Sequence, residues 1–151
     1  MSRRTVLLSV AAGVVALGGA GALTLAYAGN QPLELAHSTA RYTAPAGDRD
    51  GSLTFDTDVT GSSGVKSVKV LAWPQHSSFA EDELTAKDMA YAEPAVCEPA
   101  GKDATHCTYS VKVTRSEAES SPRGAWYVAV LATAQDGTTT LDRKASGFTV
   151  E

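Results

Sequence analysis

Cysteine and histidine, the residues that most often bind transition metals or assist a nucleophile, are scarce in this chain of 151 residues. It contains two cysteines, Cys97 and Cys107, and three histidines, His37, His76 and His106. A zinc site would have to combine His76 and His106 with the cysteines, whose spacing matches no Cys-x(2–4)-Cys pattern. The Gly-x-Ser-x-Gly turn of serine hydrolases is also missing, because residues 61–64 read Gly-Ser-Ser-Gly. We therefore predict no catalytic residue, no resident metal, no cofactor and no enzymatic activity.

The N-terminal segment lacks charge after its first four residues. Arg3 and Arg4 precede an uncharged run over residues 5–28, which ends in Ala-Tyr-Ala. A basic head, an apolar middle and a small-residue exit are typical of a secretory signal peptide. We predict that residues 1–28 are a cleaved signal and that residues 29–151 form one domain. An uncleaved membrane anchor stays open as an alternative because the run is long enough, and the Arg3-Arg4 head partly resembles a twin-arginine export signal.

Basic residues are also in the minority. The chain has 13 lysines and arginines against 17 aspartates and glutamates, and loss of Arg3 and Arg4 with the signal leaves 11 against 17, a net charge of −6. This balance argues against nucleic acid and anionic membrane surfaces as partners, since both attract basic patches. We expect a secreted protein without stable membrane insertion after cleavage, free or associated with the cell wall. In that oxidising compartment Cys97 and Cys107 are expected to form a disulfide.

Short strand patterns dominate residues 29–151, and no alternation of strands with long helices is visible. Apolar residues recur at every second position in several segments, and residues 125–134 are apolar on both faces, which predicts a central strand. Asp136-Gly137 is a strong hairpin signal before the last strand. The predicted strands cover residues 33–42 (an edge strand), 52–59, 65–73, 107–113, 125–134 and 138–150. With a further strand near residue 96, about seven short strands predict an all-β antiparallel sandwich.

Two helix-start signals interrupt this pattern. Ser78 precedes Glu81 by three residues, a capping-box spacing that predicts a short surface helix over residues 78–91. Thr114 and Glu117 have the same spacing and predict one helical turn.

The segments 61–70 and 124–137 resemble strands of bacterial immunoglobulin-like modules, through Ser-Gly-Val-Lys-Ser-Val and Gly-Ala-Trp-Tyr-Val with Ala-Gln-Asp-Gly. The whole of residues 29–151 also resembles a family of small exported actinobacterial proteins of unassigned function, most specifically over residues 40–48 and 65–74. The resemblance implies an immunoglobulin-like sandwich with one short inserted helix, and it brings no catalytic residue. It does not imply the antibody branch, because Cys97 and Cys107 are not placed to join two sheets.

An aromatic patch is the first candidate binding site. If Val68, Val70 and Ala72 face the core, the side chains between them face outward, and the same holds for alternate residues of the 125–134 strand. The resulting outer patch contains Leu71, Trp73, Tyr127 and Leu131. It is either an exposed face for a protein or glycan partner, or it is covered by the 78–91 helix through Phe79, Leu84 or Met89. We favour the cover because this helix follows one of the two strands directly.

Carboxylates spaced two residues apart raise the question of weak calcium binding. Asp48 and Asp50 lie in a predicted turn, and Asp56 and Asp58 lie on the solvent face of a predicted strand. The complete EF-hand loop is absent, and Arg49 separates two of the acids. Solvated surface carboxylates are the alternative.

The polar segment 98–106 between the cysteines could be a braced, exposed loop, as in secreted protease inhibitors, with Lys102 as the residue that enters a protease pocket. The function itself stays unknown at this point. We favour a non-enzymatic secreted binding module, and the alternatives are a protease inhibitor and a structural protein of the cell envelope.

Overall fold

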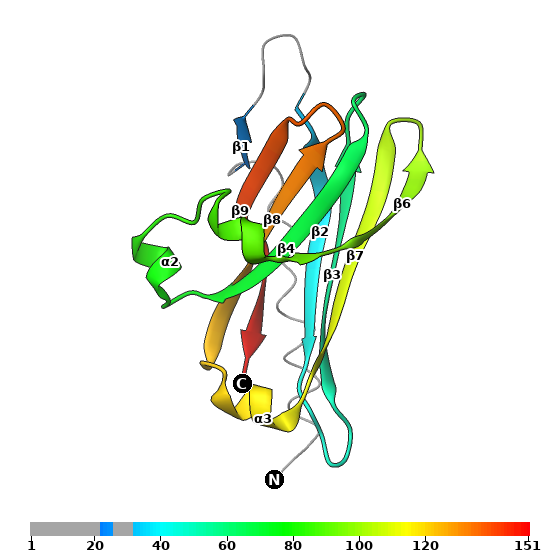
Figure 1. Cartoon of the computed structure of the whole chain (residues 1–151). Helices are drawn as coiled ribbons and strands as arrows, with labels where there is room; N and C mark the ends of the chain where they lie inside the picture. Colours follow the sequence, from blue (N-terminus) through cyan, green and yellow to red (C-terminus); the bar gives the residue numbers. More distant parts are fainter. Residues whose placement is uncertain (1–21, 26–31) are drawn as a thin grey trace.

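The computed structural model describes residues 22–25 and 32–151, which form two antiparallel β-sheets packed face to face (Figure 1). The first sheet has the order β1-β9-β8-β4-β5. Its strands are β1 (Ala22–Leu25), β4 (Val65–Pro74), β5 (Glu93–Pro94), β8 (Gly124–Ala134) and β9 (Thr139–Val150). The second sheet has the order β2-β3-β7-β6. Its strands are β2 (Glu34–Thr43), β3 (Gly51–Thr60), β6 (Val96–Gly101) and β7 (Ala104–Val113).

The prediction of an all-β antiparallel sandwich is therefore confirmed. The order β2-β3-β7-β6 opposite β9-β8-β4 corresponds to the ABED and GFC sheets of the immunoglobulin arrangement. Among the described residues there are more strands than the seven predicted, because β1 and the two-residue β5 add to them. As expected, β2 is an edge strand and β8 is central.

The strict alternation of buried and half-exposed residues explains why β3 forms and which of its faces points into the core. Every second residue of β3 is buried and the residues between are half-exposed. Phe55, Thr57 and Val59 point into the core, which leaves Asp56 and Asp58 on the outer side of the sheet as predicted. β3 pairs over its full length with β7, with Phe55 opposite Tyr109.

The main core lies between the two sheets. Its aromatic centre is a stack in which Phe148 lies 5.8 Å from both Tyr42 and Trp126, measured between ring centroids. Other buried apolar residues of β3, β4 and β8 complete it, including Phe55, Val70 and Val130. Burial of such side chains stabilises each by about 1.5–3 kcal/mol, so this core positions both outer faces of the sandwich.

The predicted helix over residues 78–91 is not continuous. Instead of one helix over residues 78–91, the structure has α2 (Ser78–Glu81) and the 3-10 helix η2 (Asp88–Tyr91). The predicted capping box is wrong, because Ser78 lies inside α2 and no side chain caps it. The segment between α2 and η2 is held by the Asp88 carboxylate, which accepts hydrogen bonds from the Thr85 amide and hydroxyl, both at 2.7 Å. The second box is confirmed: Thr114 and Glu117 cap α3 (Arg115–Ser120) reciprocally.

The predicted signal peptide, residues 1–28, lies outside the described residues except for β1. β1 pairs antiparallel with the outer edge of β9, with Ala22 opposite Asp142 and Leu25 opposite Thr139. Cleavage after residue 28 stays a prediction, and it would remove this strand from the edge of β9. Within residues 22–25 and 32–151, no helix has the length and apolar character needed to cross a membrane.

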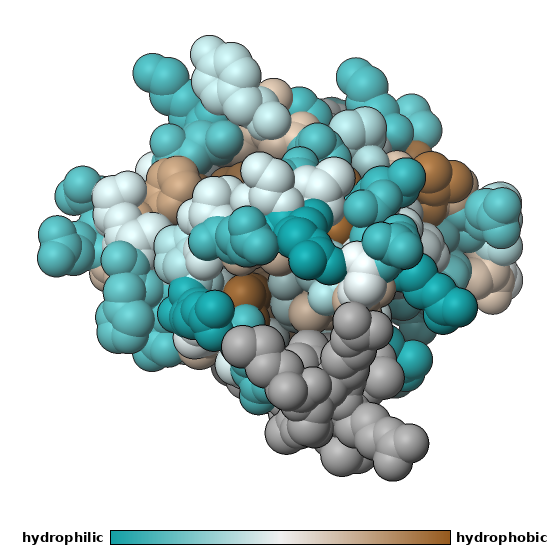
Figure 2. All heavy atoms as spheres, turned by 90° about the horizontal axis from the view of Figure 1, so that it is seen from below, coloured by the Kyte–Doolittle hydropathy of each residue, from teal (hydrophilic) through white to brown (hydrophobic). Residues whose placement is uncertain are grey.

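Seen from below, the molecule presents mostly hydrophilic side chains with small scattered apolar areas between them (Figure 2). The large apolar side chains that are clearly exposed in the described part of the chain are Tyr91 and Val96.

Candidate binding cavity

The outer face of β4, β8 and β9 carries a second hydrophobic cluster. Its buried members are Trp73, Leu84, Met89, Ala129, Leu131 and Leu141, and Leu71, Phe79, Ala86, Ala92 and Tyr127 pack against them. All four predicted patch residues, Leu71, Trp73, Tyr127 and Leu131, thus lie together. Whether they bind a partner stays a prediction.

Residues 75–92 cover this patch, which is the alternative that we favoured. Leu84 and Met89 are fully buried against it, and Trp73 is only 3% exposed. Two polar contacts fix the cover: Arg143 Nε donates to the Leu84 carbonyl at 2.6 Å, and Lys69 Nζ donates to the Ala90 carbonyl at 2.9 Å. Figure 1 shows α2 and η2 standing beside the sheet at β4, β8 and β9.

The cover leaves a cavity of about 330 Å³ next to α2. It is lined by Trp73, Gln75, His76, Phe79, Ala80, Glu83, Tyr127, Arg143 and Lys144. The Trp73 and Tyr127 rings lie 5.0 Å apart at an angle of 47°, and the Trp73 indole donates to the Arg143 carbonyl at 3.0 Å. Small-molecule sites combine such aromatic walls with a few polar groups in volumes of about 300–1,000 Å³. The cavity is at the lower end of that range.

A bulge in β9 brings the two basic residues to this cavity. Val130 pairs with Asp142 and Val128 with Ser146, so that Ala129 alone faces residues 143–145. Bulges redirect side chains relative to the regular alternation of a strand. Here Arg143 and Lys144 both line the cavity, although they are consecutive residues of one strand.

Asp142 holds the bulge from the inner side. It is 3% exposed, and its Oδ1 accepts from the Lys144 amide at 3.0 Å. Burial raises the pKa of the Asp142 carboxyl, because a charged carboxylate loses its hydration there. This arrangement could not be predicted, since neither the bulge nor the burial of Asp142 follows from its neighbours in the chain.

The outer face of the other sheet carries a cluster that sequence reasoning also missed. The Asp58 carboxylate lies 3.0 Å from His37 Nδ1 and 2.7 Å from His106 Nδ1, and His106 Nε2 lies 3.5 Å from Asp56. The hydrogen bonds from His106 and then His37 lower the pKa of Asp58, and the Asp58 carboxylate raises the pKa of His106. His37 adopts a positive φ of 53° between β2 residues whose register shifts, so a bulge aims it at β3.

The calcium candidates do not come together. Asp56 and Asp58 lie on β3, whereas Asp48 belongs to the β2–β3 turn and Asp50 lies 3.4 Å from Lys112 Nζ. Asp58 is already bonded to two histidines. Among the described residues, no group of three or more histidine, cysteine, aspartate or glutamate side chains could hold a metal ion.

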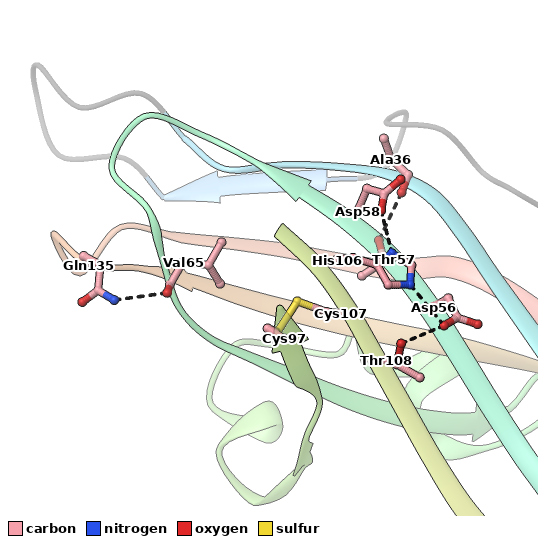
Figure 3. Close-up of a disulfide and its surroundings, with 10 residues drawn as sticks. All are labelled: Ala36, Asp56, Thr57, Asp58, Val65, Cys97, His106, Cys107, Thr108 and Gln135. Atoms are coloured by element: carbon pink, nitrogen blue, oxygen red, sulfur yellow. Dashed lines mark hydrogen bonds and ion pairs between the residues drawn. A yellow bond between two sulfur atoms is a disulfide. The ribbon is translucent and has the colours of Figure 1, made fainter. Parts of the chain in front are cut away.

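The four residues of the zinc alternative do not form a common site, because the two cysteines are bonded to each other and the two histidines lie on different sheets. Cys97 and Cys107 form the predicted disulfide, which joins directly opposed residues of β6 and β7 (Figure 3). His106 lies on the outer face of that sheet next to Asp58, whereas His76 lines the cavity on the first sheet. As expected, the disulfide lies within one sheet. It is compatible with an oxidising, extracellular environment.

The predicted loop over residues 98–106 is instead a tight hairpin. β6 and β7 continue to Gly101 and from Ala104, so only Lys102 and Asp103 form the turn. Asp103 has a positive φ of 58°, and its carbonyl accepts from the Gly61 amide at 2.9 Å. Lys102 is exposed, but it occupies a closed turn and not an extended loop, and protease pockets bind extended chains.

These features define a small disulfide-linked β-sandwich with one outer face covered by residues 75–92 and a mixed polar and aromatic cavity beside the cover. The chain belongs to a family described as a family of unknown function (DUF5707), whose sequence model matches residues 35–132. Comparison with curated proteins and with solved structures gave no match. The matched range contains Trp73, Tyr127 and both cysteines, and it ends before Arg143 and Lys144.

Proposed function

We propose that the protein is a non-enzymatic binding module that acts outside the cytoplasm and takes its ligand in the cavity beside Trp73 and Tyr127. The cavity itself is the observation that carries this proposal: two aromatic walls meet four chargeable side chains within about 330 Å³. Recognition needs apolar contact for affinity and a few placed polar groups for orientation, and this cavity offers both.

Export is supported by the signal-like N-terminus and by the disulfide. The absence of enzymatic activity is supported by the hydrogen bonds of the histidines on the second sheet. His37 and His106 both bind Asp58, and within residues 22–25 and 32–151 neither is hydrogen-bonded to a serine or threonine hydroxyl as in a nucleophile–base pair.

The proposal is tested by mapping amide chemical shifts in ¹⁵N NMR spectra while neutral sugars, sugar acids, sugar phosphates and aromatic acids are added. We expect saturable shifts around residues 73–83, 127 and 143–144, and unchanged spectra of the added compounds over hours. Shifts that cluster elsewhere, or no shifts with any of these compounds, would overturn the cavity as the ligand site. Conversion of an added compound would contradict the non-enzymatic assignment.

A matched pair of variants separates the cavity from the rest of the surface. Ala80 is exposed and lines the cavity from α2, so Ala80→Trp places a large ring in the opening without touching the core. Ser120→Trp adds the same ring at the end of α3, where Ser120 is exposed. Binding should be lost in the first variant and kept in the second.

A protease assay with the purified protein and fractionation of the producing cells test the other functions. Inhibition of a trypsin-like protease that disappears in Lys102→Ala would support the inhibitor alternative. Retention in the cell-wall fraction would support a structural envelope role, whereas recovery from the medium would support a free binding module.

A further inference from the structure

The charge of the cavity is opposite to that of the chain. Residues 29–151 have a net charge of −6, yet the cavity is lined by Arg143, Lys144 and His76 and by a single acidic side chain, Glu83. In an acidic protein, a local concentration of positive charge attracts anions to one place and repels them from the remaining surface.

Arg143 is held in position to receive an anion. Its Nε donates to the Leu84 carbonyl at 2.6 Å, and its side chain is 23% exposed, which fixes the guanidinium at the cavity wall. The Nη2 atom lies 3.6 Å from Glu83 Oε2, and the Glu83 side chain is 84% exposed. Such an exposed ion pair is weak. Glu83 is therefore a displaceable carboxylate at the position where the anion of a ligand would bind Arg143.

The second basic residue lies on the aromatic wall. Lys144 Nζ is 4.7 Å from the centroid of the Tyr127 ring, and Phe79 lines the same cavity from α2. A ring that contacts Tyr127 and Phe79 would bring an attached anionic group between Lys144 and Arg143. Guanidinium groups suit this task because their fork of donors matches carboxylate and phosphate oxygens.

We propose that the cavity binds a ring-shaped ligand that carries a carboxylate or phosphate group, with the anion replacing Glu83 on Arg143 and the ring contacting Tyr127 and Phe79. This inference rests on the proposed function and specifies its ligand class. The feature shared by the candidate ligands is one anionic group attached to a ring of the size of a hexose.

The test uses calorimetric titration with three probes of the same ring size: glucuronate, glucose 6-phosphate and glucose. We expect one or both anionic probes to bind and glucose to bind at least about tenfold more weakly, because charged hydrogen bonds are stronger than neutral ones. The two anionic probes separate carboxylate from phosphate recognition. Binding of the preferred probe should also weaken as salt is added, since the cavity is open to solvent.

Three variants of cavity residues and one control variant assign the effect to named residues. Arg143→Gln should weaken the preferred probe about tenfold or more, while Arg123→Gln, an exposed arginine away from the cavity, should leave it unchanged. Glu83→Gln should tighten binding up to about fivefold, because it removes the competing carboxylate of a weak ion pair. Lys144→Gln tests the second charge without disturbing the Leu84 contact.

Equal binding of glucose and the anionic probes, or unchanged affinity in Arg143→Gln, would overturn this inference while leaving the cavity as a ligand site. Failure of both anionic probes would also overturn it, and shifts from other compounds in the NMR mapping would then still support the proposed function. Failure of the whole compound panel would overturn both.

Discussion

Replacing Leu84 with alanine tests whether residues 75–92 cover the outer face of the sheet in solution. Leu84 is fully buried, and it belongs to the cluster that contains Trp73, Leu131 and Met89. Buried leucine-to-alanine changes cost about 2–5 kcal/mol, the larger values occurring where the space cannot close. Because residues 75–92 form a surface layer that can settle toward the sheet, we expect a loss of about 2–3 kcal/mol in the free energy of unfolding.

The assay is urea unfolding followed by circular dichroism, together with binding of an apolar dye to the native protein. The variant should bind the dye and show red-shifted tryptophan emission, since water reaches Trp73 once the cover loosens. Val96→Ala is the control, because Val96 is 72% exposed and its truncation should change the free energy by less than about 0.5 kcal/mol. A variant with unchanged stability and no dye binding would refute the packing of Leu84 on this face.

Three further predictions concern groups outside the cover. Cys97→Ser should lower the stability in non-reducing buffer by about 3 kcal/mol through the loss of the short disulfide loop; an unchanged melting temperature would show that the bond is absent or idle. Asp58→Asn should lower the pKa of His106 toward its ordinary value in an NMR titration. It should also remove a modest stabilisation of the folded state that is fully present between about pH 4 and pH 6.5. That stabilisation is lost below this range as Asp58 is protonated, and above it as His106 is deprotonated. An unshifted His106 would contradict the contact. Asp142→Asn should raise the melting temperature at neutral pH, because the raised pKa of Asp142 means that its charged form destabilises the folded state. The gain in melting temperature should shrink as the pH falls through that pKa. A gain that stays constant with pH would contradict the raised pKa.

Strands and turns that depend on a pattern of neighbouring residues could be predicted from the sequence. The alternation in residues 52–59 predicts both the strand β3 and its buried face. The two-sided apolar pattern of residues 125–134 predicts a central strand, and β8 is central. Asp136-Gly137 predicts the hairpin that follows, where Gly137 has a φ of 89° and the Asp136 carboxylate accepts from the Thr138 amide.

Elements that depend on competing local contacts were predicted less well. The Ser78 and Glu81 pair suggested a helix over residues 78–91, but Asp88 binds Thr85 and starts a separate 3-10 turn. The segment 98–106 looked like a loop because it is polar. In the structure, residues with positive φ at Gly101 and Asp103 close it into a hairpin.

The candidate site could be predicted only in part. Leu71, Trp73, Tyr127 and Leu131 share an outer face by alternation alone, and the position of residues 78–91 in the chain suggested their cover. Arg143 and Lys144 reach the cavity through a bulge, which shifts the register and has no signature in the composition. The His37, Asp58 and His106 cluster needed the registers of β2 with β3 and of β3 with β7, which link positions far apart in the chain.

The most direct test of the cavity as the ligand site is the indole region of a ¹⁵N NMR spectrum recorded with and without glucuronate or glucose 6-phosphate. The two tryptophans give two indole signals. The Trp73 indole is bonded to the Arg143 carbonyl at the cavity, whereas the Trp126 indole is bonded to the Pro122 carbonyl and Trp126 does not line the cavity. Trp126→Phe assigns the signals. We predict that the Trp73 signal moves saturably while the Trp126 signal stays in place. A stationary Trp73 signal with both probes, or equal movement of both signals, would contradict the binding of a ring-shaped anionic ligand at this cavity.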